Sequence, residues 1–89
     1  MLYRFGMRNQ KIDTFRALID LWPAPSRSNF ARDLGLDYVH AQSMHRRNSI
    51  SPKHWPGVVA AAEVRGIPGI TTELLAGLAM ARDLERAAS

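Results

Sequence analysis

The chain has no cysteine among its 89 residues, which excludes disulfide bonds and metal sites built on thiolate ligands. It also has no apolar stretch near the ~20 residues that a membrane-spanning helix needs. Its first residues, MLYRFGMRN, lack the long apolar core of a signal peptide. We therefore expect a cytoplasmic protein that makes no contact with a membrane.

Strand patterns are scarce as well, because only Leu2, Tyr3 and Phe5 show a weak alternation. Apolar residues instead recur every three or four positions, which is the spacing of one helix face. The clearest set consists of Ile12, Phe15, Leu18, Ile19 and Trp22. The sequence therefore predicts an all-α fold, a compact bundle of roughly five helices.

Glycine and proline are few and isolated, with six and five in the chain, so they mark the joints between helices. Pro23 and Pro25 should end the first helix, because proline cannot continue its hydrogen bonding. Ser26 and Asp37 are good N-caps for the next two helices. The first three expected helices are residues 9–21, 26–34 and 37–47. A fourth opens at Ser51-Pro52, where the nearby Pro56 indicates either an irregular first turn or a later true start. After a break at residues 66–69, a last helix runs from Thr71 or Thr72 toward Ala87.

Positive charge is concentrated in the first part of the chain. Residues 1–53 contain nine Lys and Arg against four Asp and Glu, about +5, whereas residues 54–89 contain three against four, about −1. This imbalance is typical of a molecule with one face for nucleic acid and another for itself or a partner. Charge alone is equally compatible with an ordinary soluble basic domain.

The segment 30–47, FARDLGLDYVHAQSMHRR, carries the most specific pattern. It predicts two short helices joined by a tight turn at Gly35, since glycine enters a left-handed turn conformation without strain. The small side chain of Ala31 lets two helix backbones approach closely. Ala41 and Met44, three residues apart, should face inward on the second helix. Together these features are typical of a helix-turn-helix, in which the second helix enters the DNA major groove.

This segment resembles the helix-turn-helix of the lambda-repressor-like family, the Cro and cI type of phage and prophage regulators. The matching positions are Phe30, Ala31, Leu34, Gly35, Leu36, Ala41 and Met44. The likeness continues through RRNSISPKHWPGVVAAAEVRGI, so that it covers about residues 10–72. It implies a lambda-repressor-like fold and a transcriptional regulator in the bacterial cytoplasm, associated with the nucleoid. Ala41 is smaller than the branched residue more usual at that anchor, so the family's contact positions carry over only approximately.

Helix geometry indicates which side chains of the second helix face outward. With ~100° per residue and Ala41 and Met44 inside, the residues that face outward and are candidates for base readout are Val39, Gln42, Ser43 and Arg46. Glutamine can bond an adenine edge, arginine a guanine edge, and valine can contact a thymine methyl group. The alternative is an ordinary solvated helix face.

Other residues are placed where they could contact phosphates. The start of helix 26–34 offers free backbone N–H groups and the positive end of the helix dipole. The candidates are Arg27, Ser28, Asn29, Tyr38, His40, Arg47 and Lys53.

The three histidines do not predict a metal site. His40 and His45 are five residues apart and point away from each other on a helix, and His54 lies on another element. His45 is expected to be a partly buried edge residue. No serine lies in a nucleophile-elbow or Ser-Lys pattern, and no glycine-rich phosphate loop follows a strand. The four aspartates Asp13, Asp20, Asp33 and Asp37 are explained by capping, helix dipoles or solvation. We therefore expect no enzyme, no metal and no cofactor.

The aromatic and apolar residues that remain fit packing roles. Trp22 and Trp55 could stack on single-stranded nucleic acid, but their helical register favours core packing. In the last helix, the apolar band is wider than one domain needs, which points to a dimer contact or simply to a helix that wraps the domain. The candidate dimer contacts are Leu78, Met80 and Leu84.

The sequence as a whole predicts a sequence-specific regulator that binds double-stranded operator DNA as a homodimer and blocks or contacts RNA polymerase. Residues 1–8 would be an N-terminal leader or arm, residues 9–70 the DNA-binding domain, and residues 71–89 the C-terminal helix. The alternative is a small helical adaptor, such as an antitoxin or a polymerase-binding partner, whose basic face meets an acidic protein.

Overall fold

The computed structural model describes residues 12–88, and every regular element in this range is helical. This confirms the all-α fold with five α-helices. The elements are α1 (Phe15–Ile19), α2 (Ser26–Leu34), α3 (Tyr38–Arg47), a short 3-10 helix η2 (Pro52–His54), α4 (Trp55–Arg65) and α5 (Thr72–Ala88). None of these helices is long and apolar enough to cross a membrane. The expected leader, residues 1–8, with its weak alternation, lies outside the described residues.

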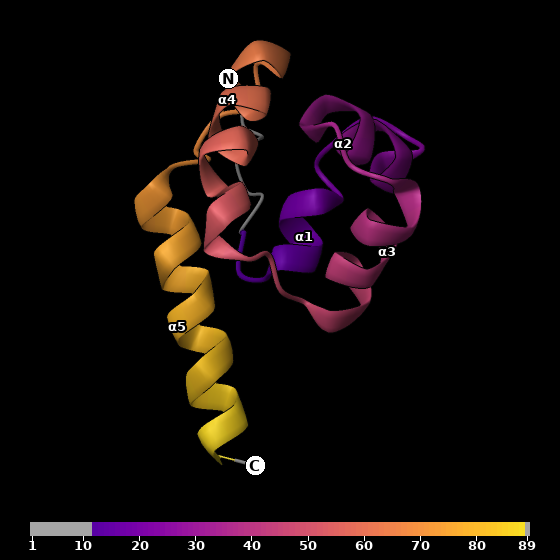
Figure 1. Cartoon of the computed structure of the whole chain (residues 1–89). Coiled ribbons are helices and arrows are strands. Elements are labelled where there is room, and N and C mark those ends of the chain that lie inside the picture. Colours follow the sequence, from indigo (N-terminus) through magenta and orange to yellow (C-terminus); the bar gives the residue numbers. More distant parts are fainter. Residues whose placement is uncertain (1–11, 89) are drawn as a thin grey trace, which may run out of the picture.

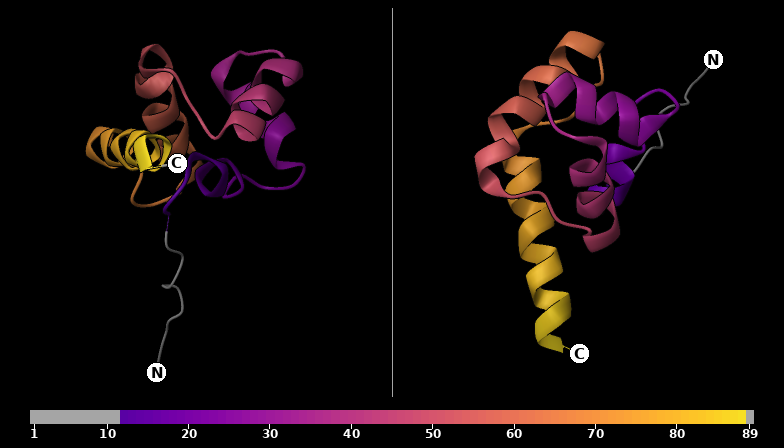
Figure 2. Two further views of the ribbon diagram at one scale, coloured as in Figure 1. Left: turned by 90° about the horizontal axis from the view of Figure 1, so that it is seen from below. Right: turned by 45° about the vertical axis from the view of Figure 1, so that its right-hand side comes forward.

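Helices α1, α2 and α3 form one cluster, and α4 packs against this cluster and against α5 (Figure 1). Helix α3 packs against both α1 and α2, and α4 packs against α2 and α5. The last turns of α5 extend beyond the rest of the molecule, as Figure 2 shows from a second direction. The fold therefore has a compact body and one projecting helix end.

Aromatic side chains form the centre of the core. Phe15 and Phe30 are fully buried, and the ring of Trp22 meets that of Phe30 edge to face at 4.9 Å between centroids. Trp55 packs against the same core and donates its indole N–H to the carbonyl of Ile50 at 2.9 Å. Both tryptophans thus have the packing role that their register predicted.

The first two helices differ from the prediction in their starts. Within the described residues the first helix is only Phe15–Ile19, because Thr14 caps it by accepting from the N–H of Ala17 at 3.0 Å. Its end is tightened by a 3-10 bond from the N–H of Trp22 to the carbonyl of Ile19, just ahead of Pro23. Residues 9–11, the start of the expected helix, lie outside the described range.

Ser26 was expected to cap α2, and this was wrong. It is the first helical residue and Pro25 occupies the cap position, while the Ser26 hydroxyl donates to the carbonyl of Trp22 at 2.9 Å. Asp37 does stand at the N-cap of α3, although its side chain makes no capping hydrogen bond. The irregular start before α4 is confirmed as η2, and Thr71 caps α5 by accepting from the N–H of Leu74 at 3.1 Å.

Candidate nucleic-acid interface

Three residues connect α2 to α3 and set the angle between the two helices. Gly35 ends α2 in the left-handed conformation, with φ +71°. The N–H of Leu36 bonds to the carbonyl of Ala31 at 2.8 Å, which satisfies the end of α2. Ala31, Ala41 and Met44 are all buried where the two helices meet. The turn and the inward face that the sequence predicted are therefore present.

The outer side of α3 carries the candidate base-reading residues. Val39 is 73% exposed, which is high for a valine, and Arg46 is also exposed. Gln42 and Ser43 are half-buried, so they project less than the pattern indicated. The four side chains still lie away from the buried anchors Ala41 and Met44, because a helix turns its opposite face outward.

Some of the candidate phosphate contacts meet in one pocket where α2 and α3 begin. Arg27, Ser28 and Tyr38 line this open pocket of about 320 Å³ together with residues of the preceding loop. Asp20 also lines it, and its carboxylate lies 3.0 Å from Nε2 of His45. His45 is half-buried beside this partner, as expected for an edge residue. The pocket therefore combines donors from two helices with one acidic group that already has a partner.

Asn29 does not belong to this pocket. Its amide donates to the carbonyl of Pro23 at 3.0 Å, and its Oδ1 accepts from Arg32 at 3.2 Å. Its side chain therefore braces the loop before α2. Arg47 and Lys53, by contrast, are exposed at the end of α3 and in η2.

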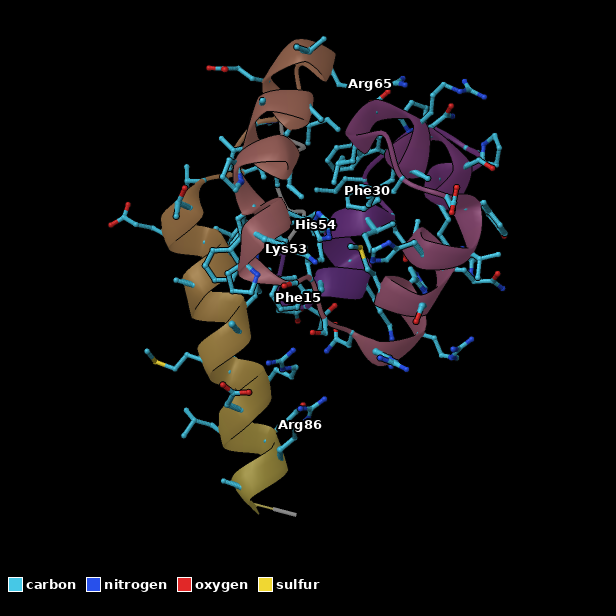
Figure 3. The ribbon with its side chains drawn as sticks, in the orientation of Figure 1. Phe15, Phe30, Lys53, His54, Arg65 and Arg86 are labelled. Carbon is cyan, nitrogen blue, oxygen red and sulfur yellow. The ribbon has the colours of Figure 1, made fainter. Side chains whose placement is uncertain are left out.

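Two histidines that are distant in sequence lie together beside α3. The rings of His40 and His54 meet edge to face, with centroids 5.3 Å apart. Nε2 of His54 is buried without a hydrogen-bond partner, and burial lowers the pKa of this imidazole, with further lowering by His40 and Lys53. Figure 3 labels His54 and Lys53 where η2 meets α4. The sequence reading separated these histidines because 14 positions and a change of element lie between them.

No group of three or more His, Asp or Glu side chains in the described part of the chain is arranged to hold a metal ion. The positive charge of Lys53 acts on His54 and repels a cation there.

The sequence analysis missed the residues that fix the end of α3. Arg16 of α1 donates from Nε to the carbonyl of His45 at 2.9 Å and from Nη2 to that of Arg46 at 3.0 Å. Asn48 closes α3 in a left-handed conformation, with φ +54°, and accepts the backbone N–H of Arg16 at 3.1 Å. An asparagine directly after a run of basic residues was the available signal, because asparagine tolerates this conformation.

Asp33 has a partner that the sequence did not reveal. Its carboxylate accepts two hydrogen bonds from Arg65 of α4, at 2.6 and 3.0 Å, and one from the indole of Trp22 at 2.9 Å. The guanidinium of Arg65 lowers the pKa of Asp33 below its ordinary value. Asp33 is thus a link between α2, α4 and the loop after α1, and its assignment to capping or solvation was wrong.

The candidate dimer residues divide between the two faces of α5. Leu78 is buried with Leu75 in the core, so its assignment to a dimer contact was wrong. Residues three positions apart lie on the same side of a helix, and this side faces α4. Met80 and Leu84 are 65% and 66% exposed on the opposite side.

Comparison with protein-family models, with curated proteins and with solved structures finds no match for this chain. Its function must therefore be inferred from the geometry above.

Proposed function

We propose that the protein is a sequence-specific, double-stranded DNA-binding regulator of phage or prophage type. In this proposal α2 and α3 act as a helix-turn-helix, and α3 enters the major groove. The observation that supports it most is the outer side of α3, where Val39 and Arg46 are exposed opposite the buried Ala41 and Met44. A helix held firmly on one face and open on the other fits the major groove, which is about 12 Å wide.

The side chains on this face have the chemistry of base recognition. Arg46 suits a guanine edge, Gln42 an adenine edge, and the methyl groups of Val39 a thymine methyl. Ser43, beside them, can donate or accept a hydrogen bond. Each good bidentate contact discriminates against a wrong base by ~1–3 kcal/mol.

Phosphates would be bound on both flanks of α3. On one flank, the pocket with Arg27, Ser28 and Tyr38 lies at the start of α2, where free N–H groups and the helix dipole favour an anion. On the other flank, Arg47 is exposed at the end of α3 and Lys53 is exposed in η2. The imidazole of His40, also exposed, lies between α3 and η2. Such contacts would position the domain without reading sequence.

A second copy would complete the interface. One helix-turn-helix contacts few base pairs, whereas two copies related by a two-fold axis place their reading helices ~34 Å apart, one turn of the duplex. Met80 and Leu84, exposed on the side of α5 opposite its buried leucines, are the apolar residues that we assign to this pairing. Occupancy of the operator would regulate transcription by blocking RNA polymerase or contacting it.

Selection from a pool of random duplexes tests the proposal. We expect enrichment of one sequence with two-fold symmetry, and binding that weakens steeply as salt rises. Tyr38 and Val39 are exposed, and Arg27 lines one pocket with Tyr38, so the same surface could instead bind an acidic protein. No binding to any duplex would favour that adaptor function, and duplex binding without any sequence preference would also reject ours.

A further inference from the structure

The C-terminal end of α3 is held by two arginines that are absent from the proposed DNA contacts. The first, Arg16, donates to the carbonyls of His45 and Arg46. Carbonyls in the last turn of a helix lack partners within the helix, so Arg16 supplies partners that α3 itself cannot. Its positive charge also lies at the negative end of the α3 dipole.

The second arginine reaches the same end from α5. The guanidinium of Arg82 donates to the hydroxyl of Ser49, the residue that follows the left-handed cap Asn48. Its other nitrogens hydrogen-bond the carboxylate of Asp83, at 3.0 Å from Nη2, which holds the guanidinium in place. The Arg82 side chain is only 20% exposed. Helix α5 thus restrains the chain directly after α3, while α1 restrains the last turn itself.

These restraints decide where the reading side chains point. Helix α3 has ten residues, about 15 Å of rise. Its start is fixed by the Gly35 turn and its middle by Ala41 and Met44. Arg46 lies beyond these anchors, in the turn whose carbonyls Arg16 holds. If the last turn frays, the backbone at Arg46 is no longer held in one orientation. The guanidinium of Arg46 then cannot keep the geometry that a bidentate hydrogen bond to a base requires.

We propose that Arg16 and Arg82 are positioning residues for base reading, which hold the last turn of α3 so that Arg46 meets the base edge in one orientation. This inference rests on the proposed function. Three hydrogen bonds join the guanidinium groups of Arg16 and Arg82 to this end of α3. They connect residues that are 29 to 33 positions apart, so they link α1 and α5 to the reading helix. The expected consequence of their loss is reduced specificity rather than reduced attraction to DNA.

The test compares variants that lose one guanidinium each. Arg16→Met and Arg82→Met keep a long apolar stem, and Arg16→Lys keeps the charge and part of the donor capacity. Arg32→Met is the matched control, because Arg32 is exposed and its hydrogen bond to Asn29 stays within α2. The dissociation constants for the selected operator and for a shuffled duplex are measured at one salt concentration, with thermal melting and amide exchange in parallel.

We expect Arg16→Met to bind the operator about tenfold more weakly, the loss of roughly one base contact. Its affinity for the shuffled duplex should fall only as far as that of Arg32→Met, and amides at the end of α3 should exchange faster. Arg16→Lys should recover part of the operator preference. If Arg16→Met does not fold, the same ratio measured on Arg82→Met decides the question.

An operator preference in folded Arg16→Met and Arg82→Met equal to that of Arg32→Met would overturn the positioning role while leaving the DNA-binding function intact. A wild-type protein with no preference between the two duplexes would overturn the function itself, and this inference with it.

Discussion

At the scale of single residues, function and stability are assigned to different side chains. The exposed residues of α3 should contribute little to the stability of the fold. Asp33 instead forms an ion pair with Arg65, and Nε2 of His54 is buried, so both residues should affect stability. Asp33 has a lowered pKa and accepts hydrogen bonds from Arg65 and Trp22, and His54 has a lowered pKa and lacks a partner for Nε2. Substitutions at these two kinds of position should therefore separate binding from stability.

Asp33→Asn should lower the free energy of unfolding by ~1 kcal/mol, because it weakens a charged hydrogen-bond pair that is partly exposed. The folded-state pKa of Asp33 is depressed, so its contribution is present above the ordinary value of 3.8 and is lost as pH falls through the lower folded value. Chemical denaturation at pH 7 and at pH 3 measures both effects. Asp13→Asn removes the same charge from an exposed position and should change neither.

His54 should make the protein less stable as pH falls below about 6.5. Its folded-state pKa is lowered, so the unfolded chain takes up a proton in a range where the folded protein does not. Stability from this group is therefore complete above pH 6.5 and decreases below it. Melting temperatures between pH 7.5 and pH 5 measure the slope, and His54→Phe should make it shallower. An identical slope in this variant would show that His54 is not held neutral.

At the scale of helices, most boundaries follow from local chemistry and were predicted. Gly35 and Gly66, in left-handed conformations, end α2 and α4, and Thr71 caps α5. The start of α1 was placed too early, since residues 12–14 continue the apolar period without being helical. Periodicity shows which face is buried, but it does not show where the backbone stops following the helix.

Gly35→Val tests the turn between α2 and α3. No atom lies within 4 Å of a Cβ built at Gly35, so the cost comes from the backbone, which has φ +71°. A branched residue in this conformation should lower the stability by ~1–3 kcal/mol. Gly77→Ala is the control in equally open space inside α5, where alanine should raise the stability by ~0.5–1 kcal/mol. Thermal melting that shows the same effect for both would contradict the assigned turn.

At the scale of the whole molecule, contacts between residues distant in the sequence could not be predicted from the sequence alone. The inward face of α3 and the core tryptophans follow from spacing alone. Three pairs of residues join elements that are distant in the sequence: His40–His54, Asp33–Arg65 and Arg16–His45. The two residues of each pair are 14 to 32 positions apart, so their contact depends on how the helices pack together. A charged residue has many possible partners on a chain with 12 Lys and Arg and 8 Asp and Glu, and only the fold selects one. The same limit explains why Leu78 was assigned to the outside of α5.

The exposed apolar side chains of the last turns of α5 should be dispensable for folding and needed for assembly. Met80→Glu combined with Leu84→Glu should give a folded monomer, because these side chains are exposed, and it leaves Arg82 in place. Leu78→Glu should unfold the domain instead, since burying an unpaired charge in the core is costly. Light scattering and titrations on full and half operators measure the outcome. A wild-type protein that stays monomeric on its saturated operator would rule out the dimer.

The central claim is that α3 reads bases, and selection from random duplexes with Gln42→Ala and Arg46→Ala beside the wild type tests it most directly. Both side chains lie on the outer side of α3, and each substitution should weaken operator binding by ~1–3 kcal/mol. We expect the wild type to enrich one sequence, and each variant to enrich the same sequence with the preference lost at one base pair in each half-site. Enriched sequences that are identical for the wild type and both variants would contradict the claim.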